Sequence, residues 1–545
     1  MSQLSYSKGV TQRSLLEYTI GEALERAASG WAAGLALVSL HQGLRWSWAE
    51  LNAEVDRIAT GLLHQGVAKG DRVGIWAPNC AEWTVIQFAT ARIGAVLVTI
   101  NPAYRGSELE YALNKVGCSV LVTAPRFKTS DYVDMLRELG PDRLPQLRLM
   151  VSLGEARHVG FMTWAELRAE PDRARLAAAV ASLDRNDAIN IQFTSGTTGF
   201  PKGATLTHRN ILNNGLFCGR QIKLTPADRI CIPVPLYHCF GMVLGNLAAL
   251  TSGAAMIYPG EAYDPRAALE AVQAEGCTTL YGVPTMFITI LNQPDLDSYD
   301  VSTLRAGIMA GSPCPVTTMT AVIDKLNMVE VTIAYGMTET SPITTQTATD
   351  DPLEERVSTV GRVHPHAECK IIGPDGSTLP IGEQGEYCSR GYAVMLGYWD
   401  DPARTAEAID ADGWMHSGDL ATMDDKGYVR ITGRIKDMII RGGENIYPRE
   451  IEEFLLTHTA VGDAQVFGIS DERYGEEVCT WIIPKPGMAL TADEVIAHCK
   501  GRISHYKVPR HVKIVEQFAM TVTGKAQKFE MRKLMEAELG LANDT

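Results

Sequence analysis

Ten consecutive residues, Thr194 to Gly203, combine side chains that suit a polyphosphate. The segment reads Thr-Ser-Gly-Thr-Thr-Gly-Phe-Pro-Lys-Gly and follows an apolar, strand-like run from Ala188 to Phe193. Glycines let backbone N–H groups close around an anion, hydroxyls add donors, and the lysine adds a positive charge. It is not a Walker loop, which requires Gly-Lys-Ser/Thr at a fixed spacing, and the remaining alternative is a Ser/Thr/Gly-rich surface loop. The predicted phosphate contacts are Thr194, Ser195, Gly196, Thr197, Thr198, Gly199 and Lys202.

A second polar group of residues, Tyr335 to Glu339, follows the strand-like run from Val329 to Ala334. An aromatic ring such as that of Tyr335 can stack on a nucleotide base. The carboxylate of Glu339 suits Mg²⁺, because this ion prefers one or two carboxylates together with phosphate oxygens and water. The alternative is a tyrosine at a strand end beside a solvated glutamate. Together with the first segment, these residues favour a site for a base, a polyphosphate and magnesium.

The scaffold that must hold these segments shows alternating strands and helices. Short apolar runs at residues 72–77, 94–100 and 119–123 predict strands, and residues 81–93 predict an amphipathic helix. Leu15 to Ala28 also has helical spacing, with its apolar side chains on one side. Strands that are apolar on both faces and separated by helices indicate βαβ units and a parallel sheet.

The pattern of predicted secondary structure changes after about Gly361. Shorter, turn-rich strands at residues 369–372 and 385–388 predict an antiparallel β subdomain. Mostly polar residues from Thr432 to Asp437 separate two apolar strands and form a candidate hinge. The rest of the chain, with helices predicted near residues 449–456 and 491–502, favours a small α+β domain that can move on this linker.

The composition narrows the class of protein. The 545 residues are 46% hydrophobic and 21% charged, which predicts a large buried core. The net charge of −14 disfavours a nucleic-acid or anionic-membrane surface. Eleven cysteines without a Cys-x-x-Cys pair argue against a disulfide framework or structural zinc and favour reduced, buried thiols. Residues 1–30 contain no apolar segment of the signal-peptide type, and no run approaches 18 uncharged apolar residues, so the expected compartment is the cytoplasm.

The phosphate-binding segment resembles the signature of the adenylate-forming enzymes, the family of acyl-CoA synthetases, luciferases and peptide-synthetase adenylation domains. Further segments resemble this family in the same order, among them Gly397–Trp399 and Trp414–Asp419. The resemblance implies an α/β fold with a large N-terminal domain at residues 1–433, which includes a β subdomain at about 361–433. It also implies a small, mobile α+β domain at residues 434–545, with a hinge near Lys436.

The resemblance also assigns roles to individual residues. Tyr335 corresponds to the residue that stacks on adenine, Thr338 to the one that touches the α-phosphate, and Glu339 to the one that holds Mg²⁺. Asp419 corresponds to the residue that accepts hydrogen bonds from both ribose hydroxyls. Lys525 corresponds to the adenylation lysine, whose ammonium stabilises charge as pyrophosphate leaves. The family often has proline at the position of Ala519. The other implied contacts are Gly311, Ser312 and Arg434 for the nucleotide, and Lys436, Gly442 and Gly443 for the hinge and the CoA tunnel.

The segment from Pro235 to Gly241 resembles the acyl-binding segment of the family. Amino-acid-activating relatives have an aspartate here, and none occurs between Pro233 and Gly245, which argues against an amino-acid substrate. Acetate-specific relatives carry a tryptophan at the position of Gly336, so the glycine predicts a pocket longer than two carbons. His238 is expected to shape the carboxylate site, and the alternative is a packing histidine. The apolar candidates for the pocket are Tyr237, Cys239, Phe240, Tyr281, Met309 and Met337.

The whole pattern is most similar to medium-chain fatty acyl-CoA synthetases. The implied reaction forms acyl-AMP and pyrophosphate from a small carboxylic acid and ATP with Mg²⁺, and then transfers the acyl group to coenzyme A. Alternatives are an aryl acid, a carrier-protein thiol as acceptor, and luciferase-type oxidation of the adenylate. A degenerate nucleotide-binding protein would have lost Lys202, Glu339, Asp419 or Lys525, and all four are present. Only the habit of the family suggests a homodimer.

Overall fold

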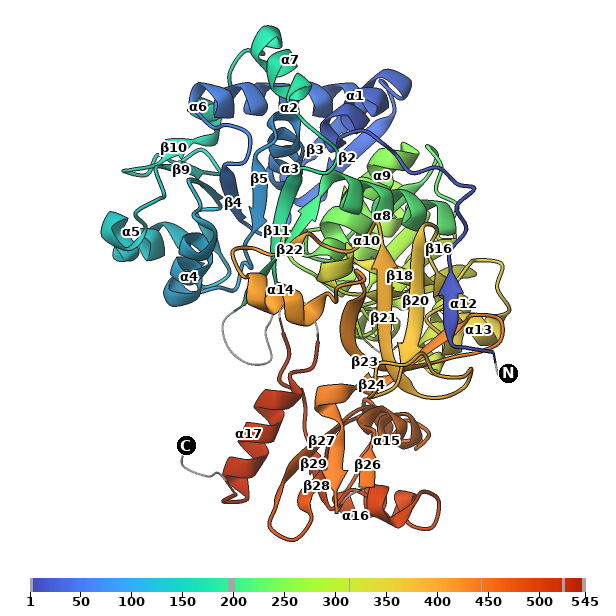
Figure 1. The fold of residues 1–545 in the computed structure, drawn as a ribbon. Helices are drawn as coiled ribbons and strands as arrows, with labels where there is room; N and C mark the ends of the chain where they lie inside the picture. Colours follow the sequence, from blue (N-terminus) through green and yellow to red (C-terminus); the bar gives the residue numbers. More distant parts are fainter. Residues whose placement is uncertain (1–2, 195–200, 313, 443, 522–524, 542–545) are drawn as a thin grey trace. The chain divides into compact units, whose positions relative to one another are not determined.

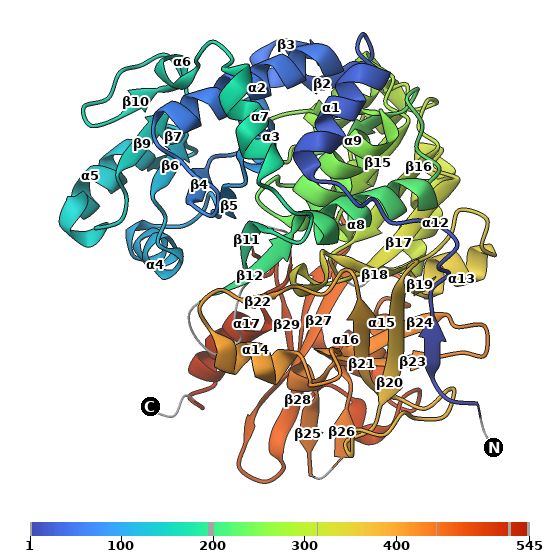
Figure 2. The ribbon, with the colours of Figure 1, turned by 45° about the horizontal axis from the view of Figure 1, so that its top comes forward.

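The computed structural model describes residues 3–194, 201–312, 314–442, 444–521 and 525–541. The chain forms two compact units, of which the larger comprises residues 7–369 and 389–415. The smaller comprises residues 1–6, 370–388 and 416–545. Figures 1 and 2 show the elements of each unit. Among the described helices, none is long and apolar enough to cross a membrane.

The larger unit contains an eight-stranded sheet that carries the phosphate-binding segment. The strand pairs β9–β6, β6–β4, β4–β5 and β5–β11 are parallel, which confirms the predicted parallel sheet. Strands β12 and β22 extend it in antiparallel fashion. In sheet order the strands are β10 (Met162–Thr163), β9 (Leu149–Ser152), β6 (Val120–Thr123), β4 (Arg72–Trp76), β5 (Val96–Thr99), β11 (Ala188–Thr194), β12 (Lys202–Thr207) and β22 (Gly397–Tyr398).

A nine-stranded sheet in the same unit carries the predicted adenine segment. Its central strands are parallel, and the pairs β17–β18, β18–β19 and β2–β3 are antiparallel. In sheet order the strands are β19 (Arg362–Val363), β18 (Ile343–Gln346), β17 (Glu330–Gly336), β16 (Ala306–Ala310), β15 (Thr279–Gly282), β13 (Arg229–Cys231), β14 (Ala255–Tyr258), β2 (Leu35–Ser39) and β3 (Leu44–Ser47).

Helices pack against these sheets, and the π-helix η2 (Phe240–Leu247) contacts α8. The main apolar cluster of the unit joins side chains from both sheets, including Val98, Ile191, Ile232 and Ile308. The helices are α1 (Ile20–Gly30), α2 (Trp48–His64), α3 (Ala81–Ile93), α4 (Gly106–Val116), α5 (Tyr132–Arg143), α6 (Trp164–Leu167), α7 (Arg173–Ala181), α8 (His208–Gln221), α9 (Ala248–Ser252), α10 (Pro265–Glu275), α11 (Pro284–Leu291), α12 (Val316–Leu326), α13 (Leu353–Ser358) and α14 (Pro402–Ala408).

Two of the predicted helices differ in detail from the structure. Helix α3 has the predicted bounds, but the prediction that it is amphipathic was wrong: every residue except Glu82 is buried. Helices α1, α2 and α7 and strands β4 and β5 all contact it, and Figure 1 shows α1, α2 and α3 side by side. Helix α1 begins at Ile20 rather than Leu15, because Thr19 and Glu22 form a capping box there.

The predicted antiparallel β subdomain is a five-stranded sheet of order β1-β20-β21-β23-β24. Strands β23 and β24 pair in antiparallel fashion. A 3-10 turn, η5 (Ile435–Asp437), follows β24 at the predicted hinge. The strands are β1 (Tyr6–Lys8), β20 (Ala367–Ile372), β21 (Gly385–Gly391), β23 (Met415–Met423) and β24 (Val429–Arg434).

The C-terminal part of the smaller unit has its own sheet and its own apolar cluster. Strand order is β26-β25-β28-β27, and β29 pairs with β28. Helices α15 (Pro448–Leu455) and α16 (Ala492–Cys499) confirm the two predicted helices. The remaining elements are β25 (Ile439–Arg441), β26 (Glu444–Ile446), β27 (Val461–Asp471), β28 (Gly475–Pro484), β29 (His511–Ile514) and α17 (Lys528–Glu538).

All eleven cysteines lie within the described residues, and all of them are buried. This confirms the expected burial of the thiols.

Candidate active site

Two paired strands frame the predicted phosphate-binding loop. Strand β11 ends at Thr194, β12 begins at Lys202, and these two residues are opposite each other in the antiparallel register. The chain therefore leaves and re-enters the sheet at one place. The other predicted phosphate contacts, Ser195, Gly196, Thr197, Thr198 and Gly199, lie outside the described residues, and their roles stay predictions.

The side chains of Lys202 and Glu339 meet at the hydroxyl of Tyr398. Lys202 Nζ donates to Tyr398 Oη at 3.0 Å, and Tyr398 Oη donates to Glu339 Oε1 at 2.8 Å. Thr194 Oγ1 donates to the same carboxylate oxygen at 3.4 Å. The fold thus gathers three of the residues that the sequence predicts for phosphate and magnesium, although Thr194 and Glu339 are 145 positions apart.

Glu339 lies in η4 (Thr338–Thr340), a 3-10 turn that follows β17. Glu339 is 8% exposed, and its backbone carbonyl accepts a hydrogen bond from the N–H of Met395 at 2.9 Å. A buried carboxylate with hydroxyl neighbours is a hard oxygen donor set, which fits an Mg²⁺ ion that takes its other ligands from phosphate and water. The predicted α-phosphate contact Thr338 is buried beside it, and Tyr335 is half-buried near the end of β17.

Gly336 allows two backbone segments to approach closely. A β-carbon at this position would lie 1.7 Å from the carbonyl oxygen of Pro342. The register between β17 and β18 shifts at Tyr335 and Gly336, and glycine often marks such an irregularity in a strand. The resemblance explains Gly336 by an open pocket. The structure adds a steric explanation, because a side chain at this position would clash with the backbone of Pro342.

The predicted acyl pocket is largely one apolar cluster. Tyr237, Cys239, Phe240, Tyr281 and Met337 all belong to this cluster or pack against it. The rings of Phe240 and Tyr281 stack, with their centroids 5.9 Å apart. Apolar and aromatic side chains of this kind suit the binding of an alkyl or aryl group.

Met309 is placed differently from these pocket candidates. Its side chain packs in a second apolar cluster with residues such as Met319 and Val331, whereas its neighbour Ile308 belongs to the first cluster. The reason is that successive side chains of a strand point to opposite faces. Beyond β16, Gly311 adopts a positive φ of 95°, and the half-buried Ser312 accepts a weak hydrogen bond at its carbonyl from the Cys314 thiol.

His238 and Cys239 stand at the start of the π-helix η2. The Nδ1 atom of His238 accepts a hydrogen bond from the N–H of Phe240 at 3.1 Å, so a neutral ring carries its proton on Nε2, where it can donate to a carboxylate. The Cys239 thiol donates to Gln192 Oε1 at 3.0 Å. Burial raises the pKa of this thiol to about 12, so the thiol stays protonated at neutral pH and is no nucleophile.

In the smaller unit, the predicted ribose residue Asp419 pairs with Arg434. These residues are opposite each other on β23 and β24, and Arg434 Nε lies 3.2 Å from Asp419 Oδ1. Glu386 supports the segment from the neighbouring strand, because its Oε1 accepts from the N–H of Gly418 at 2.9 Å and its Oε2 lies 3.0 Å from His416 Nδ1. Asp419 is 8% exposed, and the pairing of β23 with β24 holds its backbone in place.

The predicted hinge and CoA residues lie at the start of the C-terminal part. Lys436 is exposed in η5. Gly442 has a φ of 59° and donates its N–H to the carbonyl of Tyr474 at 2.8 Å, so the end of β25 is held beside the start of β28. Arg441 supports it by a double hydrogen bond to Glu477, 2.8 Å at each nitrogen. Gly443 lies outside the described residues.

Lys525 is half-buried after a short segment that lies outside the described residues. Its N–H donates to Thr521 Oγ1 at 3.0 Å, and its carbonyl accepts from the N–H of Thr521 at 2.7 Å. An isolated bridge between Met520 and Ala526 closes the same turn. The backbone of the predicted adenylation lysine is therefore anchored on both sides.

The sequence reasoning gave no role to two residues of this site. Tyr398 belongs to a segment that resembles the family, but nothing in the sequence indicates that it meets Lys202 and Glu339. Gln192 precedes the phosphate loop, and its amide bonds both the Cys239 thiol and the sulfur of Met242. One signal for Gln192 is that a polar residue in a buried strand must find a hydrogen-bond partner.

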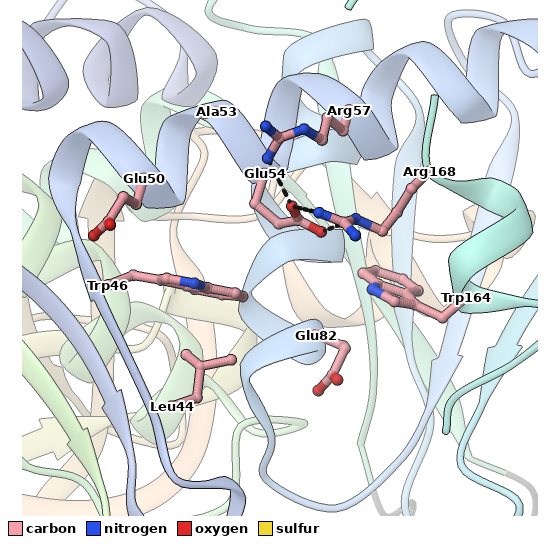
Figure 3. Close-up of a pocket in the computed structure, with 9 residues that line it drawn as sticks. All are labelled: Leu44, Trp46, Glu50, Ala53, Glu54, Arg57, Glu82, Trp164 and Arg168. Carbon is pink, nitrogen blue, oxygen red and sulfur yellow. Dashed lines mark hydrogen bonds and ion pairs between the residues drawn. The ribbon is translucent and has the colours of Figure 1, made fainter. Parts of the chain in front are cut away.

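A surface pocket of about 400 Å³ in the larger unit contains none of the predicted site residues. Its most buried carboxylate, Glu54, is paired with Arg168 at 2.7 Å and with Arg57 at 3.2 Å, as Figure 3 shows. The lining therefore offers no counterpart to the phosphate-binding and acyl-binding residues. It consists of Leu44, Trp46, Glu50, Ala53, Glu54, Arg57, Glu82, Trp164 and Arg168.

Sequence comparison finds the AMP-binding enzyme family at residues 24–399 and the AMP-binding enzyme C-terminal domain at residues 450–525. The chain is 46% identical over 559 aligned positions to a protein of Macaca fascicularis named medium-chain acyl-CoA ligase ACSF2, mitochondrial. That similarity covers 99% of this chain and 90% of the relative.

Solved structures with a similar fold include the anthranilate CoA ligase AuaEII in complex with anthranoyl-AMP, with a TM-score of 0.86 and 25% identity. That similarity covers 96% of this chain and 99% of AuaEII. ATP-bound MatB from Rhodopseudomonas palustris has a TM-score of 0.81 and 28% identity, and the similarity covers 95% of this chain and 99% of MatB.

Proposed function

The chain belongs to the family of AMP-binding enzymes, and from this premise we propose that it is an ATP-dependent acyl-CoA synthetase for medium-chain fatty acids. In the first half-reaction, a carboxylate oxygen attacks the α-phosphorus of ATP and pyrophosphate leaves. In the second, the thiol sulfur of coenzyme A attacks the carbonyl carbon of acyl-AMP and AMP leaves. The observation that carries the proposal is the similarity over 99% of the chain to a ligase named for medium-chain acyl groups.

In the first half-reaction, Lys202 and the loop before it bind the phosphates of ATP. Thr338 contacts the α-phosphate, and Tyr335 stacks on adenine. Glu339 holds Mg²⁺, which when bound supplies charge compensation for the polyphosphate. Support comes from the hydrogen-bonded group of Lys202, Tyr398 and Glu339, which concentrates one cation and one carboxylate at the end of the phosphate loop.

The ribose contact and the adenylation lysine are proposed from the family pattern, as Asp419 and Lys525. Asp419 accepts hydrogen bonds from the ribose hydroxyls, and its ion pair with Arg434 supports this role because it orients the carboxylate. Lys525 stabilises the charge that develops as pyrophosphate leaves. Lys436 is the hinge for the second half-reaction, and Gly442 and Gly443 line the path of coenzyme A.

The acid binds in the apolar cluster around Phe240 and Tyr281. His238 donates from Nε2 to the carboxylate, in line with its neutral tautomer. An amino-acid substrate is disfavoured, because the acyl-binding segment offers no carboxylate to an α-ammonium group. Gly336 leaves room beyond two carbons.

A carboxylate panel tests this function. Acids from acetate through palmitate, with benzoate and cinnamate, are incubated with ATP, Mg²⁺ and CoA, and AMP and thioester are measured separately. A maximum of kcat/KM at intermediate fatty chains is the expected result. AMP release without CoA thioester would move the acceptor to a carrier protein or another nucleophile.

An aryl acid is the second candidate substrate. The specific observation in its favour is the structural similarity to a CoA ligase solved with anthranoyl-AMP, over 96% of this chain. The stacked rings of Phe240 and Tyr281 would suit an aromatic acyl group as well. A kcat/KM for benzoate or cinnamate above that of every fatty acid in the panel would establish this alternative.

The compartment and the oligomeric state are further proposals. The cytoplasm is the compartment expected from the sequence, and cell fractionation with an antibody against the chain tests this. A homodimer follows from the habit of the family, and light scattering during size-exclusion chromatography measures it.

A further inference from the structure

The hydroxyl of Tyr398 connects a cation to a carboxylate inside the larger unit. It accepts from Lys202 Nζ at 3.0 Å and donates to Glu339 Oε1 at 2.8 Å. The ammonium also lies 4.2 Å from the centroid of the Tyr398 ring, within the range of a cation–π contact. One side chain therefore contacts both the proposed phosphate-binding lysine and the proposed magnesium-binding glutamate.

The position of Tyr398 is fixed by the backbone around it. Strand β22 pairs with β12, and Tyr398 is opposite Ala204. Trp399 donates its N–H to the carbonyl of Gly203 at 2.7 Å, and the N–H of Tyr398 bonds Thr405 Oγ1 at 2.9 Å. The phenol thus projects from an ordered strand beside the start of β12, which carries Lys202.

The same stretch also holds the backbone of Glu339, because the N–H of Met395 donates to its carbonyl at 2.9 Å. In this arrangement the phenol O–H is the donor and the carboxylate of Glu339 is the acceptor.

We propose that Tyr398 is a positioning residue for the adenylation step, which spaces the ammonium of Lys202 from the carboxylate of Glu339 before MgATP binds. This inference rests on the proposed function. Without the hydroxyl, the two opposite charges are free to pair directly, and a direct ion pair competes with the phosphates for Lys202 and with Mg²⁺ for Glu339. The hydroxyl of Tyr398 holds Lys202 and Glu339 in place. When MgATP binds, the phosphates replace the hydroxyl at Lys202, and Mg²⁺ replaces it at Glu339.

Tyr398→Phe tests the proposal, because it removes only the hydroxyl oxygen. Pyrophosphate release is measured against Mg²⁺ at fixed ATP and against the fatty acid at saturating MgATP. We expect the Mg²⁺ concentration at half-maximal rate to rise by about 10-fold, the usual scale for a lost hydrogen bond to a charged group. The KM for the fatty acid and the rate of thioester formation from supplied acyl-AMP are expected to stay within about 2-fold of wild type.

Tyr263→Phe is the matched control. Tyr263 is half-buried, and its hydroxyl bonds the carbonyl of Met286 at 2.7 Å and the hydroxyl of Thr289, neither of which belongs to the proposed site. This variant is expected to keep the wild-type dependence on Mg²⁺. A thermal melt of both variants shows whether either has lost its fold.

Binding measurements decide the matter independently of turnover. Mn²⁺ binding in the presence of α,β-methylene-ATP is followed by electron paramagnetic resonance, with wild type and Tyr398→Phe compared. An unchanged metal affinity in the variant overturns the proposal, and so does an equal loss of the adenylation and thioester steps, which would indicate a purely structural role. If wild type binds metal and nucleotide but converts no acid of the panel, the proposed function is wrong. The comparison of metal binding between wild type and Tyr398→Phe still tests the role of Tyr398.

Discussion

Replacement of Gly336 by alanine is expected to damage the protein before it alters the preference for chain length. The new β-carbon would lie 1.7 Å from the carbonyl oxygen of Pro342 and 2.8 Å from its carbonyl carbon. Because real β-carbon contacts stay above 3.0 Å, the segment at Pro342 has to move by about 1.3 Å. Overpacking costs about 1–3 kcal/mol, and more where the obstacle is backbone. Since η4 with Glu339 lies between the two positions, the shift is expected to reach the proposed magnesium site.

Thermal unfolding and the carboxylate panel measure this effect together. We expect Gly336→Ala to lower the Tm and to reduce kcat/KM by at least about 10-fold for every acid, acetate included. Gly30→Ala is the control, since Gly30 ends α1 and a β-carbon there meets nothing within 4 Å. Gly336→Ala with wild-type stability and a selective loss of the longer acids would refute the steric argument and leave pocket length as the only role of this glycine.

Three further perturbations address the smaller unit. Lys525→Ala is expected to abolish pyrophosphate release but to leave thioester formation from supplied acyl-AMP nearly intact; equal loss of both steps contradicts the assignment. Glu477→Ala removes the buried partner of Arg441 and is expected to cost about 3 kcal/mol in urea unfolding, whereas a cost below about 1 kcal/mol contradicts the reasoning. Burial raises the pKa of Asp463 from its usual 3.8 to about 6, so this carboxyl destabilises the fold above pH 6 and the cost disappears below about pH 4. Asp463→Asn should therefore stabilise the protein by about 3 kcal/mol at pH 8 and by less than about 1 kcal/mol at pH 4, and an equal effect at both pH values would exclude this cause.

Local sequence patterns predicted the bounds of helices and strands well. They predicted less well which of their polar side chains are buried. Helix α3 was predicted with its bounds, because apolar residues flanked by Cys80 and Gly94 define it. Its polar residues suggested a solvated face, but they are buried with internal partners. Gln87 donates to the carbonyl of Met242 at 3.0 Å, and Thr90 bonds the carbonyl of Ile86 one turn earlier at 2.8 Å. A sequence shows that a side chain is polar, but not that the fold provides its partner.

The candidate site depends on strand register in the same way. The sequence predicted Lys202 and Glu339 from their own segments, since each motif contains its own chemistry. The hydroxyl between them comes from a third segment, and it arrives there because Tyr398 is opposite Ala204 in the pairing of β22 with β12. A shift of that pairing by one residue would turn the phenol to the other face of the sheet and leave glycine or tryptophan at its place. Local sequence therefore predicts the charges of this site, whereas their spacing is a property of the folded sheet.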